Sequence, residues 1–164
     1  MPALHTYDVD LVWLGARDVG TVSYTSYGRD HELRATDRPA LPGTSDPAFR
    51  GDPTRWSPED LLVGALAQCH MLWLLHLAAE AGVVVVDYTD RASGTMRIEA
   101  AGHGQFRDVV LRPQVTLASA TTATGAPITD ELLAGLHERA HEHCFIARSV
   151  NFPVGVRPAP VIVR

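Results

Sequence analysis

Two cysteines, Cys69 and Cys144, are the residues of this chain best suited to do chemistry. They are the only cysteines among 164 residues, which is too few for a scaffold held together by disulfides. The first residues, MPALHTYDVDLVWLGARDVG, lack the basic stretch and the apolar run of a signal peptide. We therefore expect a cytoplasmic protein with reduced thiols, in which such a pair is structural, metal-binding or redox-active.

A short histidine motif offers a different chemistry. The run His137-Glu138-Arg139-Ala140-His141 matches H-E-x-x-H, which on a helix supplies two zinc ligands and the general base of a hydrolase. His143 and Cys144 follow it, and His70 stands beside Cys69, so a third ligand is conceivable. The chain has eight histidines, however, and the pattern fixes only three positions. We therefore favour solvated helix histidines, predict no metal site, and keep a zinc-dependent hydrolase as an alternative function.

Composition sets the frame for both interpretations. Apolar residues make up 46% of the chain and charged residues 20%, as in ordinary globular proteins, so one domain over residues 1–164 or half of an intertwined dimer is expected. The formal net charge is −5, without a run of like charges. Nucleic acid is excluded as the main partner, because phosphate binding requires clustered Lys and Arg.

The element that carries Cys69 is the clearest in the sequence. Ser57-Pro58-Glu59-Asp60 has an N-cap serine, proline at the first helical position and an acid at the third. An uninterrupted apolar run follows until Gly82, which is a typical C-terminal stop. The pattern predicts a helix from about Pro58 to Ala81, roughly 36 Å long. It is apolar nearly all round, which indicates burial on most of its faces.

A membrane-spanning interpretation of this helix is weaker. Leu61 to Ala79 has about the length that crosses a bilayer. Gln68, His70 and His76 lie in its middle part, and neither an aromatic belt nor flanking positive charge accompanies it. The sequence therefore predicts a buried central helix and no membrane partner.

The remaining elements are shorter, and together they predict an α+β fold. Antiparallel sheet would wrap around the long buried helix, with no internal repeat. A second helix begins after Thr129 as N-cap and continues towards His143. We expect strands over Asp8 to Trp13, Gly20 to Tyr27, Val83 to Tyr88, Ser93 to Ala100, Val109 to Leu117 and Ser149 to Arg164, a turn at Gly28 to His31, and a loop from Pro39 to Pro58.

The stretch SPEDLLVGALAQCHMLWLLHLAAEAG resembles the signature of the OsmC/Ohr family of organic hydroperoxide reductases. In that family a Ser-Pro-Glu or Asn-Pro-Glu opens the central helix, and the peroxidatic cysteine follows ten residues after the glutamate, as Cys69 follows Glu59 here. Cys144 matches the second family cysteine, although Phe145 replaces the proline that usually follows it. The resemblance covers roughly Thr21 to Val156 and implies an OsmC-like fold, an intertwined homodimer and no bound cofactor.

Thiol chemistry states what else the site needs. Only a thiolate attacks a peroxide, so Cys69 requires a nearby cation that lowers its pKa, and a carboxylate helps to hold that cation. The resemblance supplies an arginine and a glutamate for these roles, and the glutamate matches Glu59. Tyr27-Gly28-Arg29-Asp30 resembles the turn that carries the arginine in the Ohr branch, and Arg50 lies near its position in the OsmC branch. We favour Arg29 and keep Arg50 as the second choice.

The spacing of Glu59 and Cys69 leads to a prediction about assembly. Ten helical residues separate them by roughly 15 Å along the axis. If both serve one site, Glu59 comes from a second subunit or acts through a long arginine. A two-fold dimer with antiparallel central helices meets this need. We therefore predict a homodimer with two sites at its interface.

The resemblance implies a three-step cycle. Cys69 attacks the peroxide, releases an alcohol and becomes a sulfenic acid, which Cys144 converts into a Cys69–Cys144 disulfide. An external dithiol, in this family typically a lipoylated protein, then reduces the disulfide. The apolar neighbours of Cys69 suit an organic hydroperoxide better than hydrogen peroxide. The replacement by Phe145 keeps a non-catalytic OsmC-like binding protein open as a further alternative.

Overall fold

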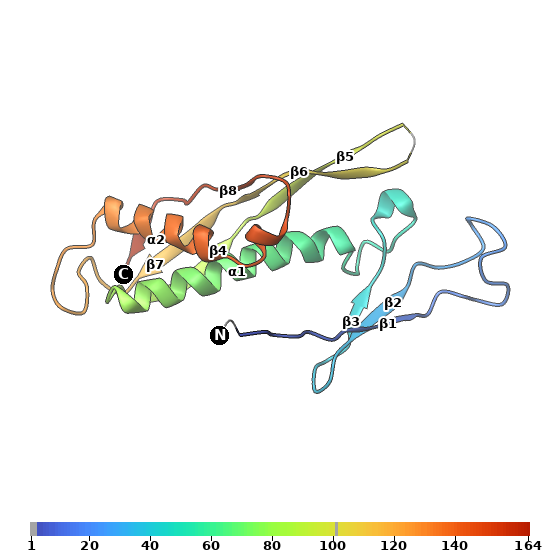
Figure 1. The fold of residues 1–164 in the computed structure, drawn as a ribbon, viewed down its shortest axis with the longest axis horizontal. Coiled ribbons are helices and arrows are strands. Elements are labelled where there is room, and N and C mark those ends of the chain that lie inside the picture. The colour runs from blue at the N-terminus through green and yellow to red at the C-terminus, as the bar shows by residue number, and fades with distance from the viewer. Residues whose placement is uncertain (1–2, 101) are drawn as a thin grey trace. The chain divides into compact units, whose positions relative to one another are not determined.

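The computed structural model describes residues 3–100 and 102–164 (Figure 1). Two compact units are distinguished by their internal contacts, Met1–Leu61 and Leu62–Arg164. Each unit is described by itself below. The expectation of a single domain over residues 1–164 stays a prediction.

The first unit contains a small antiparallel sheet with the strand order β1-β2-β3. Leu14 donates its backbone N–H to Asp30, and Gly28 donates to Gly15, so the segment after β1 and the segment before β2 run close together. Gly15 has no room for a side chain at this approach. The loop expected before the long helix holds both β3 and a short 3₁₀ helix. The bounds are β1 Asp10–Trp13, β2 His31–Arg34, β3 Leu41–Gly43 and η1 Pro47–Phe49.

The strand predicted from Gly20 to Tyr27 is wrong, because this segment forms successive turns. The hydroxyl group of Ser26 donates to the carbonyls of Gly20 and Ser23, at 2.6 and 2.8 Å, and these bonds close the turns locally. Val22 is 75% exposed and so contributes little to a core. The β-branched and aromatic composition that predicted a strand therefore serves a surface loop here.

The long helix α1 spans Pro58–Glu80 and confirms the predicted capping signals. Ser57 and Asp60 form a reciprocal capping box: the Asp60 N–H donates to the Ser57 hydroxyl at 3.1 Å, and the Ser57 N–H donates to the Asp60 carboxylate at 3.0 Å. At the other end Gly82 adopts φ +70°, the left-handed conformation that stops a helix. The length and the composition of α1 would allow it to cross a membrane. Core helices of soluble proteins share these two properties.

A single chain buries α1 along one side only. Its fully buried residues are Leu66, His70, Leu74, Leu77 and Ala78, whereas Leu72 is 62% exposed. The expected burial on most faces is thus not reached within one chain. An apolar helix that keeps large side chains in water is typical of a subunit that pairs with another.

Two three-stranded sheets complete the second unit, with the orders β4-β7-β9 and β5-β6-β8. The strand predicted over Val109 to Leu117 divides at Arg112, where the chain leaves one sheet and enters the other. Pro153, Pro158 and Pro160 likewise interrupt the predicted C-terminal strand, because proline cannot donate to a ladder. Both C-terminal strands pair in parallel, so the sheets are mixed. The bounds are β4 Val85–Asp90, β5 Ser93–Ile98, β6 Gly104–Leu111, β7 Pro113–Leu117, β8 Val154–Val156 and β9 Ile162–Val163.

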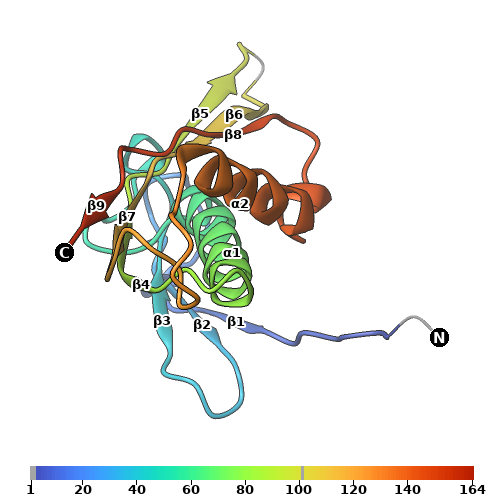
Figure 2. The same ribbon diagram turned by 90° about the vertical axis from the view of Figure 1, so that its left-hand side faces the viewer.

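The second helix, α2, spans Asp130–His143 and lies alongside α1 in the second unit (Figure 2). Leu74 and Leu77 of α1, Leu136 of α2 and Leu117 of β7 belong to one buried cluster. A second cluster joins α1 to β6 and to the segment after α2. The α+β fold with a long helix against sheet is confirmed, and its two helices are fixed to each other by the first cluster.

The N-cap of α2 provides a stability prediction. The hydroxyl of Thr129 accepts the backbone N–H of Leu132 at 3.2 Å. Thr129→Ala is expected to lower the free energy of unfolding by about 1 kcal/mol, because that N–H loses its partner. Urea unfolding measures the loss, with Thr36→Ala at an exposed turn as the control. An equal loss in both variants would contradict the capping role.

Candidate active site

Cys69 and Cys144 are brought together from distant parts of the sequence. Cys69 lies in the middle of α1 and is partly exposed, whereas Cys144 caps the C-terminus of α2 and is 1% exposed. Both thiols are free, and Cys69 lies close enough to Cys144 to help raise the pKa of the Cys144 thiol. The two sulfur atoms are thus placed for thiol–disulfide chemistry, with Cys69 as the one that solvent reaches.

The environment of Cys144 keeps its thiol protonated. Burial, together with the contact to Cys69, raises the pKa of Cys144 to about 11. The backbone N–H of Ala147 donates to its sulfur at 3.4 Å, which acts in the opposite direction with a smaller effect. At neutral pH, Cys144 is therefore a poor nucleophile on its own. A protonated thiol of this kind is better suited to react with an oxidised cysteine beside it than to attack a peroxide directly.

Local structure after α2 explains how Cys144 is held. The helix ends at His143, and a single 3₁₀ turn, η2 (Ala147–Ser149), follows. The backbone N–H of Arg148 donates to the Cys144 carbonyl at 3.0 Å. Cys144 thus sits in a tight turn between two helical segments, and a core cluster packs α2 against α1.

An aromatic pocket is lined by residues that lie one helical turn after Cys69 and directly after Cys144. Trp73, one helical turn after Cys69, meets the ring of Phe145 edge to face, with centroids 5.6 Å apart and an interplanar angle of 87°. The ring of His143 also contacts Trp73, with centroids 5.0 Å apart. Together with Glu142 and Arg148, these three rings line a pocket of about 470 Å³.

The H-E-x-x-H motif does not present its two histidines as a pair of free ligands. His137 is buried, and its Nδ1 lies 3.0 Å from Nε2 of His70, with the two rings nearly parallel at 7°. Burial lowers the pKa of both imidazoles to about 4, so the pair is uncharged at neutral pH. Within residues 3–100 and 102–164, no three histidine, cysteine or acidic side chains are grouped as a metal site. The geometry therefore gives the zinc hydrolase interpretation no support.

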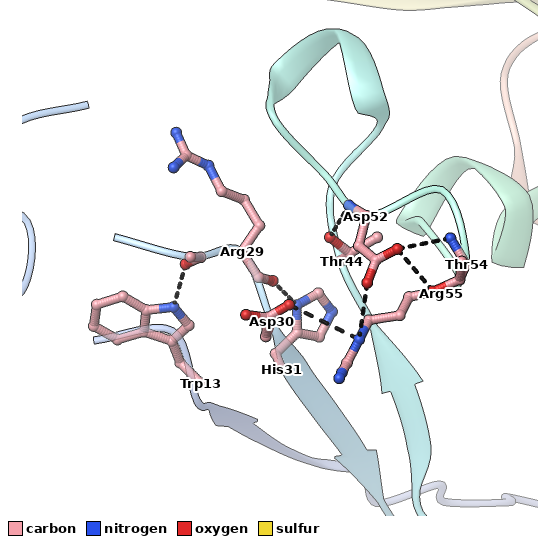
Figure 3. A network of polar contacts seen from close by, with 9 residues as sticks. Trp13, Arg29, Asp30, His31, Thr44, Asp52, Thr54 and Arg55 are labelled. Atoms are coloured by element: carbon pink, nitrogen blue, oxygen red, sulfur yellow. Dashed lines mark hydrogen bonds and ion pairs between the residues drawn. The ribbon is translucent and has the colours of Figure 1, made fainter. Parts of the chain in front are cut away.

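Arg29 lies in the first unit, in the segment before β2, and its guanidinium is already positioned. It donates to the carbonyls of Tyr27 and Tyr24, at 2.7 and 2.9 Å, and stacks on both tyrosine rings at 4.1 and 4.5 Å. Figure 3 shows the guanidinium pointing away from the neighbouring ion pairs that Arg55 makes with Asp30 and Asp52. Two ring faces and two carbonyls leave three N–H groups free of these contacts.

Backbone contacts around Arg29 fix the segment itself. The indole N–H of Trp13 donates to the Gly28 carbonyl at 2.9 Å, and the Nδ1–H of His31 donates to the Arg29 carbonyl at 2.9 Å (Figure 3). The prediction that Arg29 activates Cys69 stays a prediction. Its guanidinium is nevertheless held in one place by contacts that none of the sequence patterns revealed.

The other two predicted site residues also belong to the first unit. Arg50 is exposed and caps η1 with a left-handed φ of +69°, a conformation that non-glycine residues rarely adopt. Glu59 lies in the first turn of α1, and its Oε2 is buried without a hydrogen-bond partner among the described residues. A buried carboxylate oxygen in this state is suited to receive a cation. Their roles beside Cys69 stay predictions.

Comparisons with known proteins place the chain. The family model described as OsmC-like protein matches residues 51–158. An OsmC-like protein of unknown function from Vibrio cholerae is 28% identical, with a TM-score of 0.84 over 95% of this chain and 100% of that one.

Two organic hydroperoxide resistance proteins share the fold. The OsmC protein of Legionella pneumophila is 17% identical, with a TM-score of 0.67, and 98% of this chain and 99% of that one are covered. The protein from Elizabethkingia anophelis is 16% identical, with a TM-score of 0.68, and both chains are covered completely. No curated protein sequence matches the chain significantly.

Proposed function

Because the chain belongs to the OsmC-like protein family, we propose that it is a thiol peroxidase that reduces organic hydroperoxides with Cys69. The observation that carries this proposal is the proximity of Cys69 to Cys144, whose thiol pKa it helps to raise. One thiol is accessible and the other is buried and protonated beside it. This asymmetry supports a peroxidatic role for Cys69 and a resolving role for Cys144.

The proposed reaction has two chemical steps. The thiolate of Cys69 attacks the outer oxygen of ROOH, the O–O bond breaks, and the alkoxide takes a proton and leaves as ROH, so that Cys69 becomes a sulfenic acid. The thiol of Cys144 then attacks the sulfur of Cys69, and its proton leaves with the sulfenic hydroxyl as water. The product is a Cys69–Cys144 disulfide, which a dithiol reduces back to two thiols.

We further propose that Arg29, or Arg50 in its place, stabilises the Cys69 thiolate and that Glu59 holds that arginine. The buried and unpaired Oε2 of Glu59 supports this assignment, because an arginine beside it would satisfy the oxygen. We also propose a homodimer with two sites at its interface. The protein would act in the cytoplasm, where a dithiol such as a lipoylated protein serves as the reductant. The exposed apolar side chain of Leu72 on α1 supports the pairing of two subunits.

The test counts thiols and peroxide together. The reduced protein is mixed with cumene hydroperoxide, and we expect one peroxide to be consumed for every two thiols lost. Peptide mass spectrometry is then expected to find the peptides of Cys69 and Cys144 joined by a disulfide. Protein whose thiols were alkylated beforehand is the control and should leave the peroxide intact.

Other outcomes separate the alternatives. If both thiols survive while the peroxide remains, the chain is no peroxidase and a binding role replaces the proposal. Loss of one thiol per chain without a disulfide would keep Cys69 as the nucleophile but remove Cys144 from the cycle.

A further inference from the structure

The aromatic pocket beside the thiols is the feature that the cycle above leaves unused. Trp73 shares a face of α1 with Cys69, since the two are four residues apart on the helix. Phe145 follows Cys144 directly, and it is 66% exposed. The two ring walls of the pocket thus lie one helical turn after Cys69 and directly after Cys144, and its volume of about 470 Å³ is in the range of small-molecule sites.

The rings of this pocket are held in place from several sides. Trp73 packs against the main core cluster and also meets the ring of His76 edge to face, with centroids 5.7 Å apart. The Nδ1–H of His143 donates to the Arg139 carbonyl at 2.8 Å, which fixes that ring. Phe145 is the exposed member, so its ring is the one that a ligand would cover.

The charges at the rim indicate what kind of ligand fits. Glu142 and Arg148 both line the pocket, so one carboxylate and one guanidinium offset each other. An anionic ligand would be attracted by one and repelled by the other. Aromatic rings prefer edge-to-face or offset contact with another ring, and three rings offer such contacts here. The pocket thus favours an uncharged aromatic group.

We propose that Trp73 and Phe145 form a subsite for the aryl group of an aryl hydroperoxide, which makes Phe145 a specificity-determining residue. This inference rests on the proposed peroxidase function and narrows it to a substrate class. The aryl ring lies against Phe145 and Trp73, while the peroxide oxygens reach the accessible thiol of Cys69. Phe145 stands where the resemblance expects proline. Its exposed phenyl ring offers the substrate a ring-to-ring contact, which a substrate with only alkyl groups cannot make.

Cumene hydroperoxide and tert-butyl hydroperoxide test the subsite, because they differ only by a phenyl group in place of a methyl group. Single-turnover oxidation of the reduced protein is measured with each, so that no reductant takes part. We expect Phe145→Leu to lower the rate ratio of cumene to tert-butyl hydroperoxide about three- to tenfold, the size of an aromatic pair. Phe106→Leu, which breaks the ring contact with Phe152 elsewhere in the unit, is the matched control and should keep the ratio.

A second measurement does not depend on turnover. Titration with 2-phenyl-2-propanol, the alcohol product, is expected to change the fluorescence of Trp73, and the change should be lost in Trp73→Phe and absent with tert-butanol. An unchanged rate ratio in Phe145→Leu, or equal slowing with both peroxides, would overturn the subsite alone. If neither peroxide oxidises the wild-type thiols, the proposed function fails and the subsite assignment fails with it. A loss confined to disulfide reduction would assign the pocket to the reductant and also overturn the inference.

Discussion

Cys69→Ser is expected to reduce peroxide turnover by at least about a thousandfold, as removal of a catalytic nucleophile typically does. A serine hydroxyl stays protonated at neutral pH and cannot form a sulfenic acid. Cys144→Ser is expected to behave differently: one peroxide per chain is consumed rapidly, and the reaction then stops. Steady-state peroxide loss with a dithiol, and the size of the first burst, distinguish the two variants.

The structure gives the reason for this difference. Cys69 is accessible, so its reaction with peroxide does not require Cys144. In the proposed cycle the buried thiol of Cys144, whose pKa is raised to about 11, serves only to displace the sulfenic hydroxyl. In Cys144→Ser the stalled sulfenic acid on Cys69 should be trapped by dimedone and detected by mass. Normal turnover of Cys144→Ser would remove the disulfide from the cycle, and residual activity in Cys69→Ser would move the nucleophile elsewhere.

Helix α1 could be predicted because its signals are local. The capping box of Ser57 and Asp60 and the stop at Gly82 depend on neighbours within one turn, and the apolar run between them excludes other structures. The N-cap at Thr129 is local in the same way. A helix can be predicted from a single sequence when side chains at its ends form hydrogen bonds with its own backbone.

The strand predictions that were wrong involve side chains with other roles. Tyr24 and Tyr27 looked like strand residues, but their rings stack on the Arg29 guanidinium, so the aromatic composition records a cation–π contact. Arg112 looked like a strand residue too, yet it donates its backbone N–H to Asp90 at 2.7 Å where the chain changes sheets. The bond from Arg112 to Asp90 depends on a partner far away in the sequence, and neither it nor the stacking on Arg29 follows from a periodicity.

The candidate site shows the same division. Cys69 was proposed as the nucleophile from its spacing to Glu59, and this role stays a prediction. The aromatic pocket and the pairing of His70 with His137 join residues of two helices, which a spacing along the chain does not indicate. The histidine motif is instructive here, because His137 was assigned to an exposed helix face and instead lies buried against α1. A five-residue pattern defines spacing along a helix but not which side meets the core.

The buried pair of His70 and His137 predicts a loss of stability in acid. In the folded protein burial lowers the pKa of His70 and His137 from 6.5 to about 4. Between these values the unfolded chain binds protons that the folded chain does not. The free energy of unfolding therefore decreases as the pH falls from about 6.5 to about 4, by roughly 3 kcal/mol or more for the pair, and levels off below.

Urea unfolding at pH 7.5, 6 and 5 measures this slope. The double variant His70→Leu/His137→Leu replaces both polar partners with apolar ones and should lose most of the slope while remaining folded. His137→Leu alone should be less stable at every pH, because it leaves His70 buried without its partner. His76→Leu, at an exposed histidine of the same helix, is the control and should keep the wild-type slope. An unchanged slope in the double variant would mean that other groups carry the acid sensitivity and that the pKa values of the pair do not differ between the folded and the unfolded chain.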